Sequence, residues 1–295
     1  MKGDPRYLNL GTEFWTAVRM ISAQQGYTVR QRSGAGPIKV HDRASLIRFV
    51  NESQIDTAAF IKDGKLTDLG DLLLEYFAYR ADVLNNGVEG NLMNLEKARG
   101  LYEKLLREHQ PRWPVVMNKQ KGETKGPAYL TGIVNILLEQ ELGNVPCDYN
   151  PQKLSYFTKR MILSGMLSRR VDGALPSTVN PIAVWEIKEY YHTKTFGSRV
   201  SDGVYESYLD GLELRDIRAT LGIQVDHLLV LDDHFTWWVK GRSYLCRIVD
   251  MLHMGILTEA IFGVEALTRV PALAREWKHR YEDEYQADGP PTLFK

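Results

Sequence analysis

The sequence predicts a mixed α/β (α+β) fold, in which a mixed β-sheet core is flanked by helices and follows a helical or winged-helix-like N-terminal domain. Apolar residues recur at helical spacing early in the chain, and the second half alternates helical and extended segments. A polar stretch punctuated by Gly and Pro, residues 111–127, separates these two parts. We therefore expect a domain at residues 1–112, a second domain at residues 113–270 and a C-terminal tail at residues 271–295.

The N-terminal domain is expected to open with an amphipathic helix over residues 10–25, which Gly26 ends. A short strand over residues 27–32 follows and places Arg30 and Arg32 on the same face. The first fifty residues carry eight Lys or Arg against three Asp or Glu. Because local charge decides binding to phosphates, this domain is a candidate for contact with nucleic acid.

The rest of this domain is expected to contain a helix capped by Asp42, a strand and turn over residues 60–66, and a long helix over residues 72–84. This order is similar to the end of a winged-helix module. The alternative is a helical domain that only supports the rest of the chain.

The second half is expected to begin with a helix over residues 128–142, which is rich in Leu, Ile and Val. Two strands at residues 167–172 and 181–191 follow, separated by a turn that contains Pro176. The remaining expected elements are a helix at 201–220, a strand at 226–231, a short strand at 236–239 and a helix at 243–262. This order predicts a sheet with helices layered on its faces.

Composition excludes several classes of protein. Two cysteines, Cys147 and Cys246, are too few for a disulfide framework or a zinc site. No apolar run approaches the roughly 20 residues that a membrane helix needs, and the first residues do not resemble a signal peptide. We therefore expect a cytoplasmic protein with no membrane partner. The total charge is balanced, with 37 basic and 37 acidic residues, but residues 151–200 carry eight basic residues against three acidic ones.

The segment that carries chemistry contains Asp172 and, after thirteen intervening residues, Glu186-Ile187-Lys188 in an apolar strand. Successive side chains of a strand alternate between its faces, so Glu186 and Lys188 project together from one face. Asp172 ends the preceding strand, and a hairpin return brings it beside Glu186. Glu189 falls on the opposite face, so its substitution is expected to leave activity intact.

Two carboxylates beside an ammonium group suit the hydrolysis of a phosphodiester bond. Carboxylates are hard oxygen ligands for Mg²⁺, and a bound metal polarises the phosphoryl oxygen and lowers the pKa of its water. A lysine near the attacking water orients it and offsets charge on the phosphorus. We predict Asp172, Glu186 and Lys188 as catalytic residues. Asp172, Glu186 and the carbonyl of Ile187 are the predicted ligands of Mg²⁺, for which Mn²⁺ can substitute.

This segment resembles the PD-(D/E)XK nuclease superfamily, which includes many type II restriction endonucleases. The matching residues are Asp172 and Glu186-Ile187-Lys188, and the order of elements is similar over residues 128–260. The leading proline of the motif is absent, since Val171 precedes Asp172. The resemblance implies a restriction-endonuclease-like core and a further metal-binding acid on the first helix of that core.

For that further acid we predict Glu139, with Glu141 on the same helix and Glu206 on a later helix as alternatives. Basic residues near the motif are expected to contact phosphates of DNA. The predicted DNA-binding residues are Arg169, Arg170, Lys194 and Arg199, together with Arg30 and Arg32 of the N-terminal domain.

The resemblance therefore implies a Mg²⁺-dependent endonuclease that hydrolyses double-stranded DNA, in the manner of a type II restriction enzyme. We expect a homodimer, because one site cuts one strand and twofold symmetry supplies the second site. Two alternatives stay open. The chain is then either a nuclease effector subunit of a bacterial defence or repair complex, or a catalytically silent DNA-binding or scaffolding protein.

Overall fold

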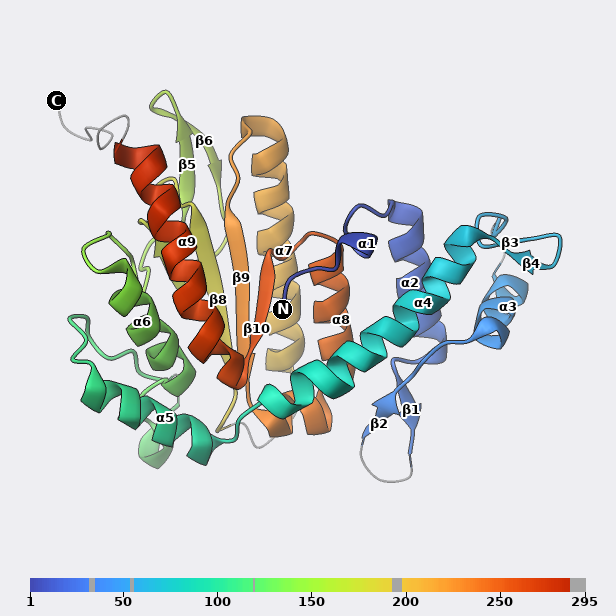
Figure 1. Ribbon diagram of the computed structural model, residues 1–295, viewed down its shortest axis with the longest axis horizontal. Helices are drawn as coiled ribbons and strands as arrows, with labels where there is room; N and C mark the ends of the chain where they lie inside the picture. The colour runs from blue at the N-terminus through green and yellow to red at the C-terminus, as the bar shows by residue number, and fades with distance from the viewer. Residues whose placement is uncertain (32–34, 54–55, 119, 193–197, 287–295) are drawn as a thin grey trace.

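A computed structural model describes residues 1–31, 35–53, 56–118, 120–192 and 198–286. A four-stranded mixed sheet with helices on both faces forms the C-terminal region, and a mostly helical region precedes it (Figure 1). The predicted fold class is therefore confirmed. No helix among these residues combines the length and the apolar composition that crossing a membrane would need.

The N-terminal region is helical, with two short antiparallel hairpins between its helices. Its elements are α1 (Pro5–Leu8), α2 (Thr12–Gln25), β1 (Thr28–Arg30), β2 (Ala35–Ile38), α3 (Arg43–Glu52), β3 (Ile61–Lys62), β4 (Lys65–Leu66) and α4 (Asp68–Asp82). Aromatic side chains such as Phe14, Tyr76 and Phe77 fill the core where α2, α3 and α4 meet. This core gives the N-terminal region apolar packing of its own.

Two predicted helix ends in this region are confirmed. Gly26 ends α2 with a φ of 88°, in the region that favours glycine, and its N–H donates to the carbonyl of Ser22. Asp42 caps α3, because its carboxylate accepts a hydrogen bond from the N–H of Ser45. These local signals lie in a few neighbouring residues, which is why the sequence reveals them.

The C-terminal region is built around a sheet with strand order β10-β9-β8-β7. Strand β7 runs antiparallel to β8, whereas β8, β9 and β10 run parallel. Its helices and strands are α5 (Leu95–Glu108), α6 (Tyr129–Leu142), β5 (Tyr156–Lys159), β6 (Ile162–Met166), β7 (Gly173–Leu175), β8 (Ala183–Glu189), α7 (Ser198–Leu221), β9 (Asp226–Asp232), α8 (Arg242–His253), β10 (Glu259–Phe262) and α9 (Ala266–Gln286). Shorter helical turns are η1 (Val83–Val88), η2 (Glu89–Asn91), η3 (Gly122–Thr124), η4 (His234–Lys240) and η5 (Gly263–Glu265).

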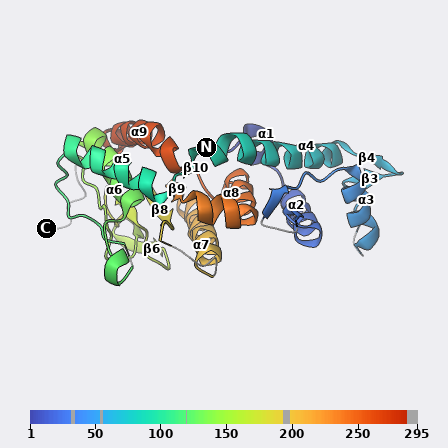
Figure 2. The same cartoon turned by 90° about the horizontal axis from the view of Figure 1, so that it is seen from below.

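The two faces of β8 pack against different helices, as the alternation of its side chains predicts. Ala183, Trp185 and Ile187 belong to the core that β8 forms with α6 and α9, and the ring of Trp185 stacks on Trp277 of α9 at 5.8 Å. Val184 belongs instead to a core with Leu214 and Ile217 of α7. Figure 2 shows α9 and α7 on opposite sides of the strands. The strand is therefore buried on both faces over its first half.

Three expected elements differ from the structure. The strand predicted at residues 167–172 is wrong, because these residues connect β6, which ends at Met166, to β7, which begins at Gly173. The helix predicted to reach residue 262 ends at His253, because Gly255 adopts a φ of 68° and the chain turns back into β10. Residues 236–239, predicted as a strand, lie in the π-helix η4, which Asp233 caps through the N–H of Thr236.

The packing of two helices, α5 and α9, does not follow the predicted domain limits. The limit at residue 112 separates α5 from α6, although Ala98 and Tyr102 of α5 are buried in the core that contains α6. Residues 271–286, predicted as a tail, form most of α9, because Trp277 and its apolar neighbours are buried on the sheet. Residues 287–295 of the predicted tail lie outside the described residues.

Candidate active site

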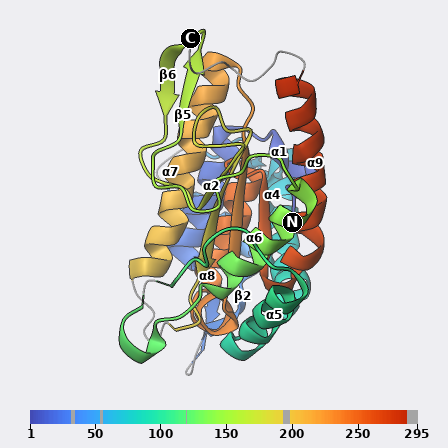
Figure 3. The same cartoon turned by 90° about the vertical axis from the view of Figure 1, so that its left-hand side faces the viewer.

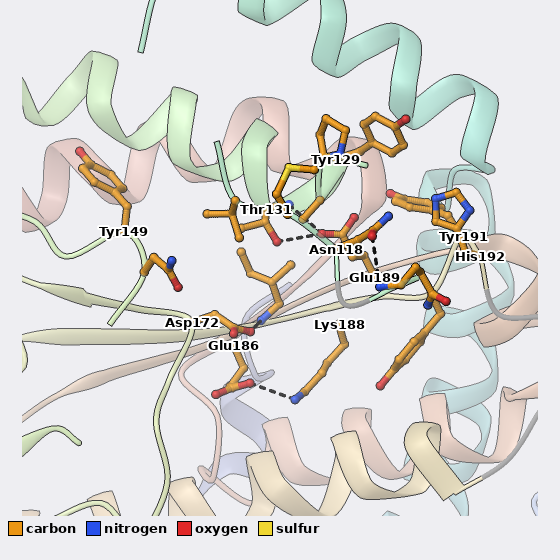
Figure 4. Close-up of a pocket in the computed structure, with 18 of the residues that line it drawn as sticks. Asn118, Tyr129, Thr131, Tyr149, Asp172, Glu186, Lys188, Glu189, Tyr191 and His192 are labelled. Carbon is orange, nitrogen blue, oxygen red and sulfur yellow. Dashed lines mark hydrogen bonds and ion pairs between the residues drawn. The ribbon is translucent and has the colours of Figure 1, made fainter. Parts of the chain in front are cut away.

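A cavity of about 410 Å³ opens beside the C-terminal half of β8 (Figure 4). Its walls come from the segment before α6, the first turn of α6, the approaches to β7, strand β8 and helix α7. The residues that matter most for its chemistry are Asp172, Glu186, Ile187, Lys188, Arg169 and Glu206, with Asn118, Tyr129, Thr131, Glu189, Tyr191 and His192 on the opposite side. The predicted motif therefore lines a hollow that can admit a ligand.

Asp172 and Glu186 lie side by side because of the register between β7 and β8. Gly173 pairs with Trp185 in this antiparallel pair, so the residues immediately outside it, Asp172 and Glu186, face each other. The Oδ2 atom of Asp172 accepts a hydrogen bond of 2.8 Å from the backbone N–H of Ile187. The predicted hairpin return, which brings Asp172 beside Glu186, is confirmed.

Lys188 extends along the same face of β8 toward the two acids (Figure 4). Its Nζ lies 2.9 Å from Oε2 of Glu186 and 2.8 Å from Oε2 of Glu206 on α7. Burial lowers the pKa of Lys188, but the charges of Glu186, Asp172 and Glu206 outweigh burial and raise it overall. Lys188 is therefore protonated at neutral pH and acts as a donor.

Arg169 adds a second cation to this cluster. Its Nη1 lies 2.7 Å from Oε1 of Glu186 and 2.6 Å from Oδ2 of Asp210, and its Nη2 lies 3.2 Å from Glu206. Burial raises the pKa of Glu186, but Lys188 and Arg169 more than offset that effect and the net pKa is lowered. The buried carboxyl of Glu186 therefore stays ionised.

Asp210 lies deeper in the same cluster and is fully buried. Burial raises its pKa to about 7; Arg169 opposes this rise, and the charge of Glu186 adds to it. At neutral pH Glu186 is therefore ionised beside two cations, while Asp210 is near its midpoint of titration.

The oxygen atoms at the edge of the cavity fit a small divalent cation. Mg²⁺ in proteins is commonly held by one or two carboxylates and completes its shell with water and substrate phosphate. Asp172 and Glu186 supply the two carboxylates, and Ile187, the residue after Glu186 on β8, also lines the cavity. Among the residues that the structure describes, no three His, Cys, Asp or Glu side chains gather closely enough to hold a metal by themselves. The donor set therefore suits Mg²⁺ bound together with a phosphate, and does not suit a structural zinc ion.

Two families match the sequence. One, described as a domain of unknown function (DUF7687), matches residues 93–277, which is more than half of the chain. The chain belongs to the DUF7687 family. A second family, also described as a domain of unknown function (DUF7690), matches residues 1–87. Searches of curated proteins and of solved structures gave no significant match. The DUF7687 region contains every residue that lines the cavity.

The acid predicted on the first helix of the DUF7687 core does not reach the cavity. Glu139 forms an ion pair of 2.8 Å with Arg112, and Glu141 pairs with Arg275 on α9. The end of α6 that meets the cavity is its first turn, and Glu139 lies more than two helical turns beyond it. Glu206, the remaining alternative, does line the cavity and contacts Lys188.

The predicted DNA-binding residues fall into three groups in this DUF7687 chain. Arg30 and Arg170 are exposed. Arg169 is turned inward and neutralises acids of the site. Arg32 and Lys194 lie outside the described residues, and Arg199 lies in α7 with its side chain outside them.

Glu189 has a structural partner that the strand pattern did not reveal. Its side chain lies on the opposite face of β8 from Lys188, as predicted, but it caps the first turn of α6. Its two carboxylate oxygens accept hydrogen bonds from the N–H groups of Leu130 and Thr131, and Oε1 also accepts one of 2.8 Å from the Thr131 hydroxyl. Burial raises the pKa of Glu189, against the lowering effect of Thr131. Glu189 is thus an unsuitable neutral control for activity.

Asp210 was missed by the reading of the motif alone. It lies four residues after Glu206 on α7, and residues at that spacing share one face of a helix. Two acids at this spacing, on the helix that follows the motif strand, are the signal that identifies the pair. Glu206 and Asp210 both contact Arg169, so this face of α7 forms the floor of the site.

Proposed function

We propose that this protein is a Mg²⁺-dependent nuclease of the PD-(D/E)XK type that hydrolyses phosphodiester bonds of double-stranded DNA. The observation that carries the proposal is the convergence of Asp172, Glu186 and Lys188 on one edge of a cavity, in the strand register that the motif requires. The order helix, strands, helix, strand around this site also agrees with that nuclease core.

The three side chains have separate tasks in this proposal. Asp172 and Glu186, with the carbonyl of Ile187, hold the cation. When bound, the cation polarises a phosphoryl oxygen and increases the acidity of its water. Lys188 stays protonated, so it orients the attacking water as a hydrogen-bond donor and offsets negative charge that develops on the phosphate. Lys188 is therefore not the general base, and the proton of the attacking water passes to solvent in the cavity.

A rival function is a DNA-binding protein whose site performs no hydrolysis. One observation favours this rival. Both carboxylate oxygens of Glu186 lie within 2.9 Å of a cationic nitrogen, from Arg169 on one side and Lys188 on the other. These cations compete with Mg²⁺ for the same oxygens, so the rival predicts no metal-dependent activity.

Nicking of supercoiled plasmid in the presence of Mg²⁺ decides between the two. Asp172→Ala and Glu186→Ala should abolish nicking while duplex binding survives, because other phosphate contacts position the DNA. Lys188→Ala should reduce the rate by roughly 10²–10³, the usual effect of removing one preorganised stabilising group. Lys188→Arg should not restore it, because a planar guanidinium does not replace a compact ammonium.

The matched control is Glu103→Gln, since Glu103 is an exposed acid of α5 that lies outside the cavity. It should nick like the wild type. Wild-type nicking by both Glu186→Ala and Lys188→Ala, or no nicking by the wild type with Mg²⁺ or Mn²⁺, would show that the nuclease proposal is wrong.

We also propose that the protein acts on DNA as a homodimer, with the N-terminal region taking part in binding. A cut through both strands requires two sites, which twofold symmetry supplies. Arg30 is exposed at the end of β1, where it is available to a phosphate. Light scattering with and without duplex tests the dimer, and duplex affinity of Arg30→Glu tests the N-terminal contact. A strict monomer that only nicks, or unchanged affinity, would contradict the respective proposal.

A further inference from the structure

The hairpin formed by β5 and β6 leaves large apolar side chains in solvent. Met161, Ile162, Leu163 and Met166 are 73%, 69%, 65% and 51% exposed, respectively. Figure 3 shows the hairpin beside α7 at one end of the molecule, with α5 toward the opposite end. Among the described strands β6 pairs only with β5, so its outer edge is open. An exposed apolar edge of this kind marks an interaction surface or an aggregation hazard.

The base of the hairpin, in contrast, is held firmly. Phe157 is fully buried in the core that includes Leu214 and Ile217 of α7. Asn180, in the turn between β7 and β8, accepts a hydrogen bond of 2.7 Å from the N–H of Thr158 and donates one of 2.9 Å to its hydroxyl. The exposed end is therefore presented on a rigid base and does not result from loose packing.

The turn at the exposed end has an unfavourable sequence for its conformation. Lys159 pairs with Ile162, so Arg160 and Met161 form a two-residue turn, with φ angles of 51° and 66°. Such turns favour Asn-Gly, because both residues occupy the left-handed region, which costs other residues about 1–2 kcal/mol each. Residues held in this region cluster at functional sites. The side chains of Arg160 and Met161 therefore come at a cost to the stability of the turn.

The charge of the hairpin segment favours a polyanion as its partner. Residues 149–171 contain five basic residues and no Asp or Glu. Of these, Arg169 pairs within the site, whereas Lys153, Lys159, Arg160 and Arg170 are exposed and form no ion pair with the part of the chain that the structure describes. A second copy of this hairpin would be repelled, and a polyanion would be attracted.

The hairpin is also connected directly to the candidate active site. Asn150 before β5 lines the cavity, and Arg169 and Asp172 after β6 belong to the site. Nine residues lie between Ile162, the first residue after the turn, and Asp172, and an extended chain spans at most about 3.6 Å per residue, so Ile162 lies within about 36 Å of Asp172. This upper limit is about one turn of B-DNA, roughly 34–36 Å. One short duplex can therefore reach both places.

We propose that the β5–β6 hairpin is an arm that binds double-stranded DNA beside the cleavage site. The inference rests on the proposed nuclease function for its choice of polyanion. Lys159 and Arg160 contact phosphates, and Met161, Ile162 and Leu163 enter the groove and contact sugars and base edges. A two-stranded ribbon fits the major groove, where apolar side chains contact the methyl group of thymine.

Two double variants test the arm without damaging the fold. Arg160→Asn with Met161→Gly installs the preferred turn and removes both side chains, so the thermal midpoint should stay equal or rise while duplex affinity falls about fivefold or more. The slope of log affinity against log salt concentration should become shallower by about 0.9, the value for one lost phosphate contact. Ile162→Thr with Leu163→Thr keeps the charges and the strand preference. It should weaken affinity without changing that slope.

Affinity is measured by fluorescence anisotropy with a labelled duplex and a chelator in place of metal, and light scattering is recorded for each protein. The matched control is Lys104→Asn, which removes one exposed positive charge from α5 and should leave affinity within about twofold. Wild-type affinity in both double variants, or a full chain that binds no duplex, would overturn the proposal. If light scattering shows that the double variants change the molecular mass in solution while duplex affinity stays the same, the hairpin contacts a second copy of the chain instead of DNA.

Plasmid nicking, measured in parallel, separates this inference from the nuclease proposal. If nicking requires Lys188 but the hairpin variants keep the duplex affinity of the wild type, the DNA-binding arm is wrong and the nuclease proposal stands. If duplex binding requires the hairpin but the wild type does not nick plasmid, the nuclease proposal is wrong and the DNA-binding arm stands.

Discussion

Arg169 Nη1 lies between two buried carboxylates, 2.7 Å from Oε1 of Glu186 and 2.6 Å from Oδ2 of Asp210. Its other terminal nitrogen reaches Glu206 at 3.2 Å. Three acids from β8 and α7 thus share one guanidinium, and Lys188 contacts two of the same acids. The buried positive and negative charges of this cluster compensate one another. Removing or adding one charge therefore leaves another buried charge without compensation.

Arg169→Ala should destabilise the protein, because it leaves Glu186 and Asp210 buried with less compensation. Breaking a buried charge pair from one side costs on the order of 3 kcal/mol. Mg²⁺ should raise the thermal midpoint of this variant more than that of the wild type, since the cation then enters a site without its competitor. Thermal denaturation with Mg²⁺ and with a chelator measures both effects. Arg170→Ala, an exposed neighbour, is the control; equal midpoints for the two variants would contradict the prediction.

Asp210→Asn should alter how stability depends on pH. The pKa of Asp210 is raised to about 7 in the folded protein, against an ordinary value of 3.8. The folded state therefore holds this proton more tightly, so the free energy of unfolding falls as pH rises from about 4 to about 7 and is level above that. Asn carries no such proton. The free energy of unfolding of the variant should therefore rise relative to that of the wild type as pH increases across this range. Denaturant titrations at several pH values measure it.

The comparison for Asp210 is Asp216→Asn, which removes an exposed acid from the same helix. The difference in free energy of unfolding between Asp216→Asn and the wild type should stay constant across the same pH range. A flat difference for Asp210→Asn as well would mean that Asp210 titrates near its ordinary value in the folded protein.

The parts of the site that lie within one strand or one hairpin were predictable from the sequence. Alternation of faces in a strand places Glu186 and Lys188 together, and hairpin register brings Asp172 to them. The prediction that Glu139 reaches the site is wrong, because helical periodicity gives a face but not the end of the helix that meets the cavity. That end is decided by packing, which here places Thr131 at the cavity.

Other elements lacked a local signal. The β5–β6 hairpin turns at Arg160-Met161, which contains neither the Gly nor the Asn that marks such turns. Residues 260–262 form a short apolar run after Glu259, and periodicity alone does not distinguish a buried strand from the end of a helix. The inward turn of Arg169 depends on Asp210, a residue forty-one positions away in sequence. Contacts of that range appear only once the chain is folded.

Glu189→Ala should destabilise the start of α6. The carboxylate of Glu189 accepts hydrogen bonds from two N–H groups at that helix end, and losing a helix cap typically costs about 0.5–2 kcal/mol. Because this turn lines the cavity, nicking should decline together with the thermal midpoint. Glu189→Gln keeps an acceptor oxygen and should recover part of both. Full activity and an unchanged midpoint for Glu189→Ala would show that Thr131 and its neighbours are held without this cap.

Arg80 on α4 and Asp250 on α8 join the N-terminal region to the sheet. Arg80 is fully buried, and its Nη1 donates to both oxygens of Asp250 at 3.0 Å, while the Tyr76 hydroxyl donates to the same carboxylate at 2.7 Å. Asp250→Ala leaves a guanidinium buried without its acid, so the free energy of unfolding should fall by about 3–5 kcal/mol. Arg80→Met with Asp250→Leu removes both charges and should recover much of this loss.

The exposed pair Lys104 and Glu108, 4.0 Å apart on α5, provides the contrast for this prediction. Both side chains are about half exposed or more, and solvent screens such pairs, so Glu108→Ala should change stability by less than about 1 kcal/mol. Denaturant unfolding of these three variants and the wild type measures the differences in the free energy of unfolding. If Asp250→Ala is no more destabilising than Glu108→Ala, Arg80 finds another partner or reaches water. The two regions would then be held together by their apolar contacts, with Met254 of the α8 end packed against the aromatic core of the N-terminal region.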